Sequence, residues 1–170
     1  MLILLAACGK SNLDLPTETM NRSLPDETST NVTITEFNEG KIGYILKADR
    51  IDRYYDRRML YAYKVELKAF DQKKGSVSVM KADSTIVDDA RNVIFANGRV
   101  SLTSAEGSVA TDRMVWDRNQ DTIVAPGRVV LTQHGNALRR TNLHTNLNIY
   151  PTEMDSVSAE GYFAEEYLDW

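Results

Sequence analysis

Short stretches of alternating apolar and polar residues recur along the chain from residue 32 onward. They contain mostly β-branched, aromatic and leucine side chains and are separated by polar turn residues, which is typical of β-strands. The stretches are 32–35, 65–67, 77–79, 93–95, 100–102, 114–116, 129–131 and 147–149. No window of helical length keeps an apolar stripe, and the nearest candidate, 53–67, fits a hairpin at least as well. The pattern predicts an all-β chain.

Two of these stretches belong to an internal repeat. Residues 96–103 and 125–132 share the pattern A-x-G-R-V-x-L-T and lie 29 positions apart. Asp83 precedes the first copy by 13 positions, and Asp112 precedes the second by the same interval. Weaker copies flank the clear ones, so the sequence predicts one unit of about hairpin length used about four times.

The turn residues indicate how the units are arranged. The polar segments 71–75, 88–92 and 117–121 fall where hairpins must reverse. Gly98 and Gly127 stand just before the V-x-L strands, where a glycine indicates a bulge or corner. Repeated antiparallel hairpins bent at a common position predict two facing sheets with V-x-L side chains between them.

The period of two predicts which side chains face the space between the sheets. The predicted inward residues are Val65, Leu67, Val77, Val79, Phe95, Val100, Leu102, Met114, Trp116, Val129, Leu131, Leu147 and Ile149. They form either a packed core or the lining of an apolar groove, and alternation alone does not separate the two.

Composition narrows the possible functions. The chain has 170 residues, 42% hydrophobic and 26% charged, as in an ordinary single globular domain. A net charge of −4 disfavours nucleic-acid binding, which needs clustered Lys and Arg. Residues 117–121 begin like a calcium loop, but Thr122 and Arg128 occupy its required Gly and Glu positions. Because nucleophile and metal motifs are lacking, the sequence predicts no enzyme activity, metal or cofactor.

The N-terminal residues have a different character from the repeats. Residues 1–8 are apolar and end in Leu-Ala-Ala-Cys, which resembles a partial lipoprotein signal with a lipobox and predicts lipidation of Cys8. A chance apolar start is the alternative. Residues 9–31 are polar with two prolines and are predicted to be a flexible linker, leaving 32–170 as the folded domain.

Basic residues concentrate in the segment 50–74 of this acidic protein. They are Arg50, Arg53, Arg57, Arg58, Lys64, Lys68, Lys73 and Lys74. They could meet phosphate groups of an anionic lipid. The alternative is a charged outer face with tyrosines covering a sheet edge.

Taken together, these features resemble the LptC family, periplasmic components of the lipopolysaccharide exporter of Gram-negative bacteria. The resemblance rests on Ala48-Asp49, Ala82-Asp83, the two repeat copies, Gly107, the segment 111–117 and Gly161. It implies an open β-jellyroll that accepts lipopolysaccharide from the inner-membrane ABC transporter LptBFG in an apolar groove. The lipid would then pass to an LptA-like bridge protein docked at a sheet edge.

The resemblance also implies a periplasmic protein held at the inner membrane. Members usually carry an N-terminal membrane helix, whereas this chain carries the lipobox pattern, so its expected anchor is a lipid on Cys8. Two other interpretations stay open at this stage: a soluble LptA-like bridge, and a structural or adhesive lipoprotein that binds no lipid ligand.

Overall fold

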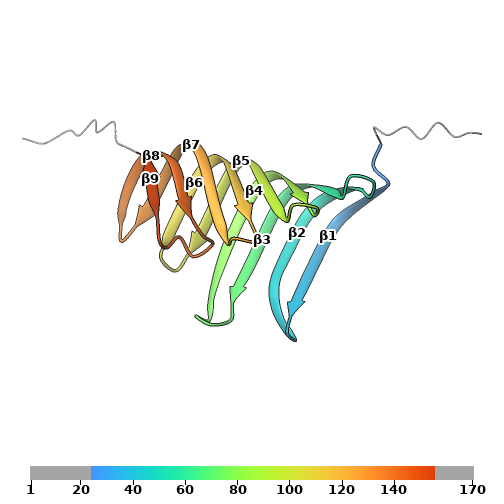
Figure 1. The fold of residues 1–170 in the computed structure, drawn as a ribbon, viewed down its shortest axis with the longest axis horizontal. Helices are drawn as coiled ribbons and strands as arrows, with labels where there is room; N and C mark the ends of the chain where they lie inside the picture. Colours follow the sequence, from blue (N-terminus) through green and yellow to red (C-terminus); the bar gives the residue numbers. More distant parts are fainter. Residues whose placement is uncertain (1–23, 156–170) are drawn as a thin grey trace, which may run out of the picture.

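The computed structural model describes residues 24–155, and within this range the regular elements are nine β-strands (Figure 1). The strands are β1 (Glu27–Asn38), β2 (Lys41–Tyr54), β3 (Met59–Asp71), β4 (Ser76–Asp88), β5 (Val93–Ser104), β6 (Gly107–Asp117), β7 (Thr122–Gln133), β8 (Asn136–Thr145) and β9 (Glu153–Asp155). They form one antiparallel sheet in sequence order, so each strand pairs only with its neighbours along the chain. The all-β prediction is confirmed.

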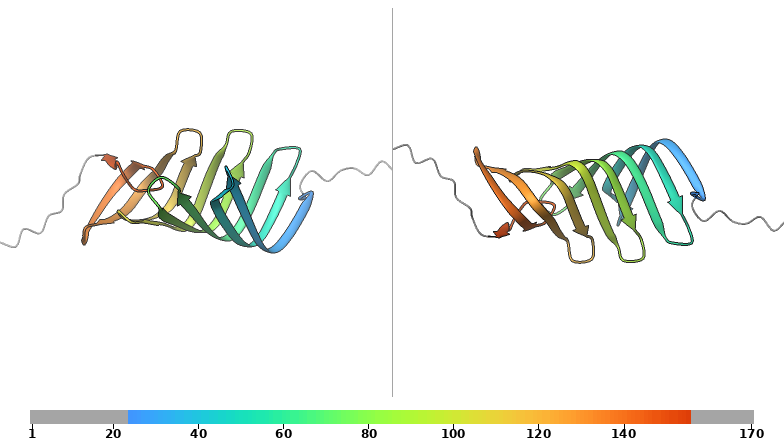
Figure 2. Two further views of the ribbon diagram at one scale, coloured as in Figure 1. Left: turned by 90° about the horizontal axis from the view of Figure 1, so that it is seen from below. Right: turned by 90° about the horizontal axis from the view of Figure 1, so that it is seen from above.

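The sheet is bent along a line that crosses β1 to β8 near their middles. Pairing is interrupted or shifted there, and the residues on this line include Asn31, Lys64, Gly98, Gly127 and Asn142, all with positive φ. We call this line the bend column. Bulges with left-handed residues increase local twist and bend a strand, and Figure 2 shows the arched strands from two further sides. The predicted bends at Gly98 and Gly127 are confirmed.

The structure refines the prediction of two facing sheets. The two layers are the two halves of a single folded sheet, because every long strand continues through the bend column. The bulges turn each strand without ending its hydrogen-bonded pairing to its neighbours. The result is an open β-jellyroll in which both layers share the same strands.

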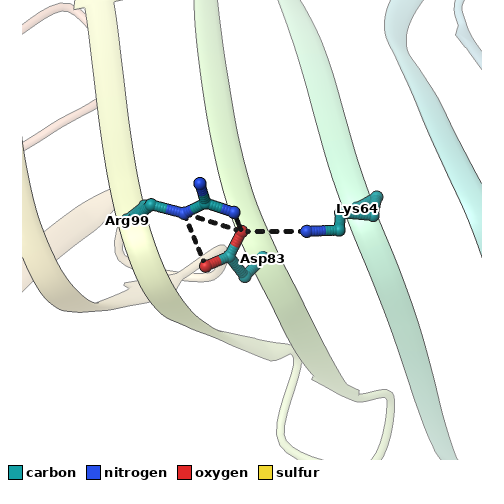
Figure 3. Close-up of polar contacts among 3 residues, drawn as sticks. All are labelled: Lys64, Asp83 and Arg99. Carbon is teal, nitrogen blue, oxygen red and sulfur yellow. Dashed lines mark hydrogen bonds and ion pairs between the residues drawn. The ribbon is translucent and has the colours of Figure 1, made fainter.

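The aspartates that mark the sequence repeat lie at this bend. Asp83 accepts hydrogen bonds from Arg99 Nε at 3.0 Å and Arg99 Nη2 at 2.6 Å, and it pairs with Lys64 Nζ at 3.5 Å (Figure 3). These three side chains come from β4, β5 and β3. Arg99 holds the pKa of Asp83 below its usual value. The first copy of the repeat therefore encodes both the bend and a cluster of charged side chains on its outer face.

Two rows of side chains face each other between the layers. One row, which we call the Leu102 row, contains Ile34, Leu46, Leu67, Met80, Leu102, Val109 and Leu131 in successive register. The other, the Trp116 row, contains Arg53, Leu60, Val87, Ile94, Trp116 and Ile123. The side chains that are almost completely buried belong mainly to β5–β8, so the core is densest in the C-terminal half.

The segment 146–152, between β8 and β9, crosses the open side of the folded sheet. We call it the strap. Its Ile149 is fully buried, and Asn148 Nδ2 donates to Asp71 Oδ2 at 3.2 Å. Ser104 Oγ donates to the Asn148 carbonyl at 2.8 Å, and Gln133 Nε2 donates to the Ile149 carbonyl at 3.1 Å. The strap therefore ties the end of β8 to the ends of β3, β5 and β7.

Two predicted segment boundaries differ from the structure, and others fall outside the described residues. The stretch 147–149 lies in the strap and not in a strand, although Ile149 is buried as expected. The predicted linker 9–31 is too long at its C-terminal end, because β1 begins at Glu27 and pairs with β2 from there. Residues 1–23, including Cys8, and residues 156–170 of the predicted domain lie outside the described range.

Candidate functional site

Most of the predicted inward residues do face the space between the layers. Those that are buried there are Val65, Leu67, Val100, Leu102, Met114, Trp116, Val129, Leu131 and Ile149, and Leu147 packs partly buried against them. Alternation with bulges at the bend placed these residues correctly. Their contact with a ligand remains a prediction.

Val77, Val79 and Phe95 were predicted to point inward, and this is wrong. In the part of β4 before the bend the buried positions are Ser78, Met80 and Ala82, so the two valines lie on the outer face, and Val77 is 41% exposed. In β5 the buried Ile94 and Ala96 flank Phe95, whose ring lies 5.8 Å from the Arg91 guanidinium. Both faces of these strands carry apolar residues, because β-branched and aromatic side chains also stabilise an exposed sheet surface.

An apolar cavity of about 190 Å³ lies between the layers in the N-terminal half. The Leu102 row contributes Ile34, Leu46 and Leu67, and the Trp116 row contributes Leu60, Val87, Ile94 and Trp116. Tyr44, Arg53, Asp89 and Arg118 complete the lining. Of these residues, only Leu67 and Trp116 belong to the predicted inward set, and Arg53 was predicted only as one of the basic residues that could meet a phosphate. The alternation of Tyr44, Leu46 and Ala48 in β2 is the signal that could have extended the list.

The cavity adjoins a wider depression of about 460 Å³ beside the turns β2–β3, β4–β5 and β6–β7. Arg53, Asp89 and Arg118 line both spaces, so these side chains form the mouth of the cavity. The outer part of the mouth is lined by Tyr54, Tyr55, Arg58, Met59 and Asn92. Polar and cationic groups thus border an apolar interior.

Tyr44 lies on the other side of the same mouth. Burial, followed by its hydrogen bond to Glu36, raises the pKa of Tyr44 to about 12, and the charges of Arg118 and Asp89 also act on it. Tyr44 belongs to the layer of the Leu102 row, whereas Asp89 and Arg118 lie in turns of the other layer. The two layers therefore approach each other at this point, and the Tyr44 phenol remains neutral at physiological pH.

The outer surface contains a larger depression, of about 820 Å³, beside the bend column. It is lined by outward-facing groups that include Arg99, Ser101, Asp112, Arg128 and Arg139. Its lining also includes the apolar residues Val100, Ala110, Val129 and Val130.

Residues 24–155 contain no group of three His, Cys, Asp or Glu side chains arranged to hold a metal ion. In the same range there is no helix of the length and hydropathy that a membrane crossing requires.

Comparison with known proteins identifies a family to which the sequence matches. The model of the family described as "Lipopolysaccharide-assembly, LptC-related" matches residues 1–149. The chain belongs to the LptC-related family. No curated protein matches the chain. Among solved structures, it is similar to LptH of Pseudomonas aeruginosa, described as the LptA-homologous periplasmic component of the lipopolysaccharide transport device. That match has 8% identity and a TM-score of 0.44, and covers 62% of this chain and 84% of LptH.

Membership of the LptC-related family confirms the resemblance predicted from the repeat. It associates the chain with lipopolysaccharide assembly. Within this family setting, the interior between the layers and its cationic mouth are the candidate site for an amphiphilic ligand.

Proposed function

We propose that this LptC-related protein accepts lipopolysaccharide from the inner-membrane ABC transporter LptBFG and passes it to an LptA-like bridge protein. The acyl chains would occupy the space between the layers, and a lipid on Cys8 would hold the protein at the inner membrane. The observation that carries the proposal is the apolar cavity lined by both layers of a single folded sheet. The protein would act by binding alone, and ATP hydrolysis by the transporter would supply directionality.

Burial of acyl chains can offset the cost of removing a lipid from the bilayer. Each buried CH₂ group contributes about 0.8 kcal/mol. The cavity of about 190 Å³ is smaller than the roughly 300–1,000 Å³ of typical ligand pockets. A lipid with several chains would therefore require the layers to move apart in the N-terminal half, where the cavity lies and where, of the contacts described above, the strap makes only the Asn148–Asp71 contact.

The two ends of the sheet offer docking surfaces for neighbouring proteins. β1 and β9 are the edge strands, and unpaired edge groups can accept a further strand. Strand addition at these edges would join the jellyroll to the transporter at one end and to the bridge protein at the other. A continuous apolar path could then form between adjoining domains.

Photocrosslinking tests the lipid path. A benzophenone amino acid at Leu67 or Leu102, both buried between the layers, should form adducts with lipopolysaccharide in cells. The same substitution at Phe95, on the outer face of β5, is the control and should form few. Adducts at Phe95 alone, or at none of these positions, would sink the proposal. A lipoprotein without a lipid ligand would give the latter result.

Metabolic labelling tests the anchor. Radiolabelled palmitate should be incorporated into the full chain and lost in the Cys8→Ala variant, which should also leave the membrane fraction. Unlabelled, soluble wild-type protein with interior crosslinks would instead indicate a soluble bridge of the LptA type.

A further inference from the structure

Arg53 occupies a position that is apolar on strands β3 to β7. In the Trp116 row it lies opposite Leu60, which is followed by Val87, Ile94, Trp116 and Ile123. The Arg53 backbone is fixed on both sides, because its carbonyl accepts from Asp26 N at 2.9 Å beside its β1 partner Glu27, and Leu60 of β3 is its partner on the other side. The guanidinium is thereby directed to the mouth of the apolar cavity.

Arg118 reaches the same mouth from the turn between β6 and β7. Its side chain is only 18% exposed, and Arg118 Nη2 lies 3.5 Å from Asp89 Oδ1. The Arg118 amide donates to the Asn92 carbonyl at 3.1 Å, which fixes the turn against its neighbour. Two arginines from distant parts of the chain therefore border one opening.

Both arginines have an unsatisfied donor. The Nε atoms of Arg53 and Arg118 are buried and have no hydrogen-bond partner among residues 24–155. A buried guanidinium donor without an acceptor costs free energy, which an incoming anion would recover. The Arg53 guanidinium also lies 5.9 Å from the centre of the Tyr55 ring, a contact that leaves its hydrogen-bond donors available.

The charge balance at the mouth favours an anion. Arg53, Arg58 and Arg118 face a single carboxylate, Asp89, among the residues that line the wider depression. The Glu27 carboxylate, the cross-strand neighbour of Arg53, accepts a hydrogen bond from the Tyr55 hydroxyl at 2.6 Å, which lowers its pKa, and the Arg53 charge acts in the same direction. Guanidinium groups recognise phosphate with paired, planar donors.

We propose that Arg53 and Arg118 form a subsite for a phosphate group on the lipid whose acyl chain enters the adjoining cavity. The inference rests on the proposed function and extends it, because it names the headgroup chemistry and the entry point. The ligand would be an acylated sugar phosphate, with its chains between the layers and its phosphate at the mouth. Of the eight basic residues in segment 50–74, only Arg53 and Arg58 line this mouth, and Arg118 comes from elsewhere.

Binding of two matched lipids tests the subsite. The full chain would be titrated with phosphorylated lipid A and with the same lipid after removal of its phosphates. Wild type should bind the phosphorylated form more tightly, by roughly tenfold for each arginine that contacts phosphate. Arg53→Gln and Arg118→Gln should each reduce this preference, and the double variant should remove it while still binding dephosphorylated lipid A.

Arg113→Gln is the matched control, because it removes the same charge from an exposed position of β6 outside the mouth. It should keep the wild-type preference, and circular dichroism should show a folded sheet in every variant. Equal wild-type affinity for both lipids, or an unchanged preference in the double variant, would overturn the subsite alone. Failure of wild type to bind either lipid would overturn the proposed function as well. Competition by millimolar inorganic phosphate as strong as that by the lipid would indicate a free-anion site and overturn the headgroup assignment.

Discussion

The glycines of the bend column show why both repeat copies have glycine at this position. Gly98 has φ +70°, and a Cβ atom added there would lie 2.9 Å from Asp83 Oδ2 and 3.0 Å from Asp83 Cβ. Asp83 cannot easily move aside, because Arg99 and Lys64 hold it. Gly127 has φ +84° with no atom within 4 Å of an added Cβ. Both repeat glycines therefore need a left-handed backbone conformation, but only Gly98 also lacks room for a side chain.

This pair gives a direct prediction for stability. Gly127→Ala should lower the free energy of unfolding by about 1–2 kcal/mol, the cost of a left-handed non-glycine residue. Gly98→Ala should lower it by about 2–4 kcal/mol, because steric overlap with Asp83 is added. Chemical denaturation of both variants measures the difference. Equal losses would mean that the approach of Gly98 to Asp83 is unimportant for folding.

A buried carboxylate on β2 predicts part of the pH dependence. The Asp52 side chain is 4% exposed, pairs with Arg50 and accepts from Thr28 Oγ1 at 2.8 Å. Arg50, followed by the Thr28 hydrogen bond, lowers the pKa of Asp52 against the opposing effect of burial. Because the folded pKa is the lower one, this stabilisation is present above the unfolded pKa near 4 and is lost as pH falls below it.

Asp52→Asn should therefore be less stable than wild type at pH 7, by roughly 1–2 kcal/mol, and closer to wild type near pH 3. Urea unfolding between pH 7 and pH 3 provides the comparison. Asp49→Asn, an exposed change on the same strand, should follow the wild-type curve. A constant difference between Asp52→Asn and wild type across this range would contradict the assignment.

At the scale of elements, the strap depends on one buried side chain. Ile149 is fully buried despite φ +58°, which is unfavourable for a β-branched residue, so packing outweighs backbone strain there. Ile149→Ala should cost about 2–3 kcal/mol, at the low end for such a truncation because some strain is relieved. The neighbouring Tyr150 is 65% exposed, and Tyr150→Ala should change stability little.

Thermal unfolding followed by circular dichroism would compare these two strap variants. Ile149→Ala should also lose protection of the strap against limited proteolysis, since its contacts with Ser104 and Gln133 depend on the same segment. Similar melting temperatures for Ile149→Ala and Tyr150→Ala would show that the strap is dispensable.

The strands also show what alternation can and cannot predict. The turn segments, the bends at Gly98 and Gly127 and the inward residues of β6 and β7 followed from turn chemistry and the period of two. Val77, Val79 and Phe95 did not, because both faces of β4 and β5 carry apolar residues. Arg118 could not be associated with Arg53 at all, since only the folding of the sheet brings the β6–β7 turn to β2. Local patterns thus determine strands, whereas the site depends on how the layers meet.

At the scale of the whole molecule, the sequential order of strands would allow one half of the sheet to maintain the fold while the other half opens for a ligand. Each strand pairs only with its chain neighbours, so local opening at one end need not disrupt the other. The almost completely buried Leu102, Met114, Ile123 and Leu131 lie in β5–β7, and two of the three strap contacts reach the ends of β5 and β7. The cavity lies mainly between the layers of β1–β4, and Ile94 of β5 and Trp116 of β6 form its border with the denser half. Lipid entry would therefore use the less densely packed half, while the C-terminal half keeps the fold intact.

Hydrogen exchange with mass spectrometry can measure this division. Without ligand, amides of β6 and β7 should exchange most slowly and those of the edge strand β1 most rapidly. Phosphorylated lipid A should add protection chiefly in β1–β4, because a ligand stabilises the elements that surround it. The lipid's sugar portion without acyl chains should add little, since it lacks the apolar surface that fills the interior. If the added protection instead fell on β7 and β8, or were uniform along the chain, lipid entry between the layers at the Arg53 mouth would be excluded.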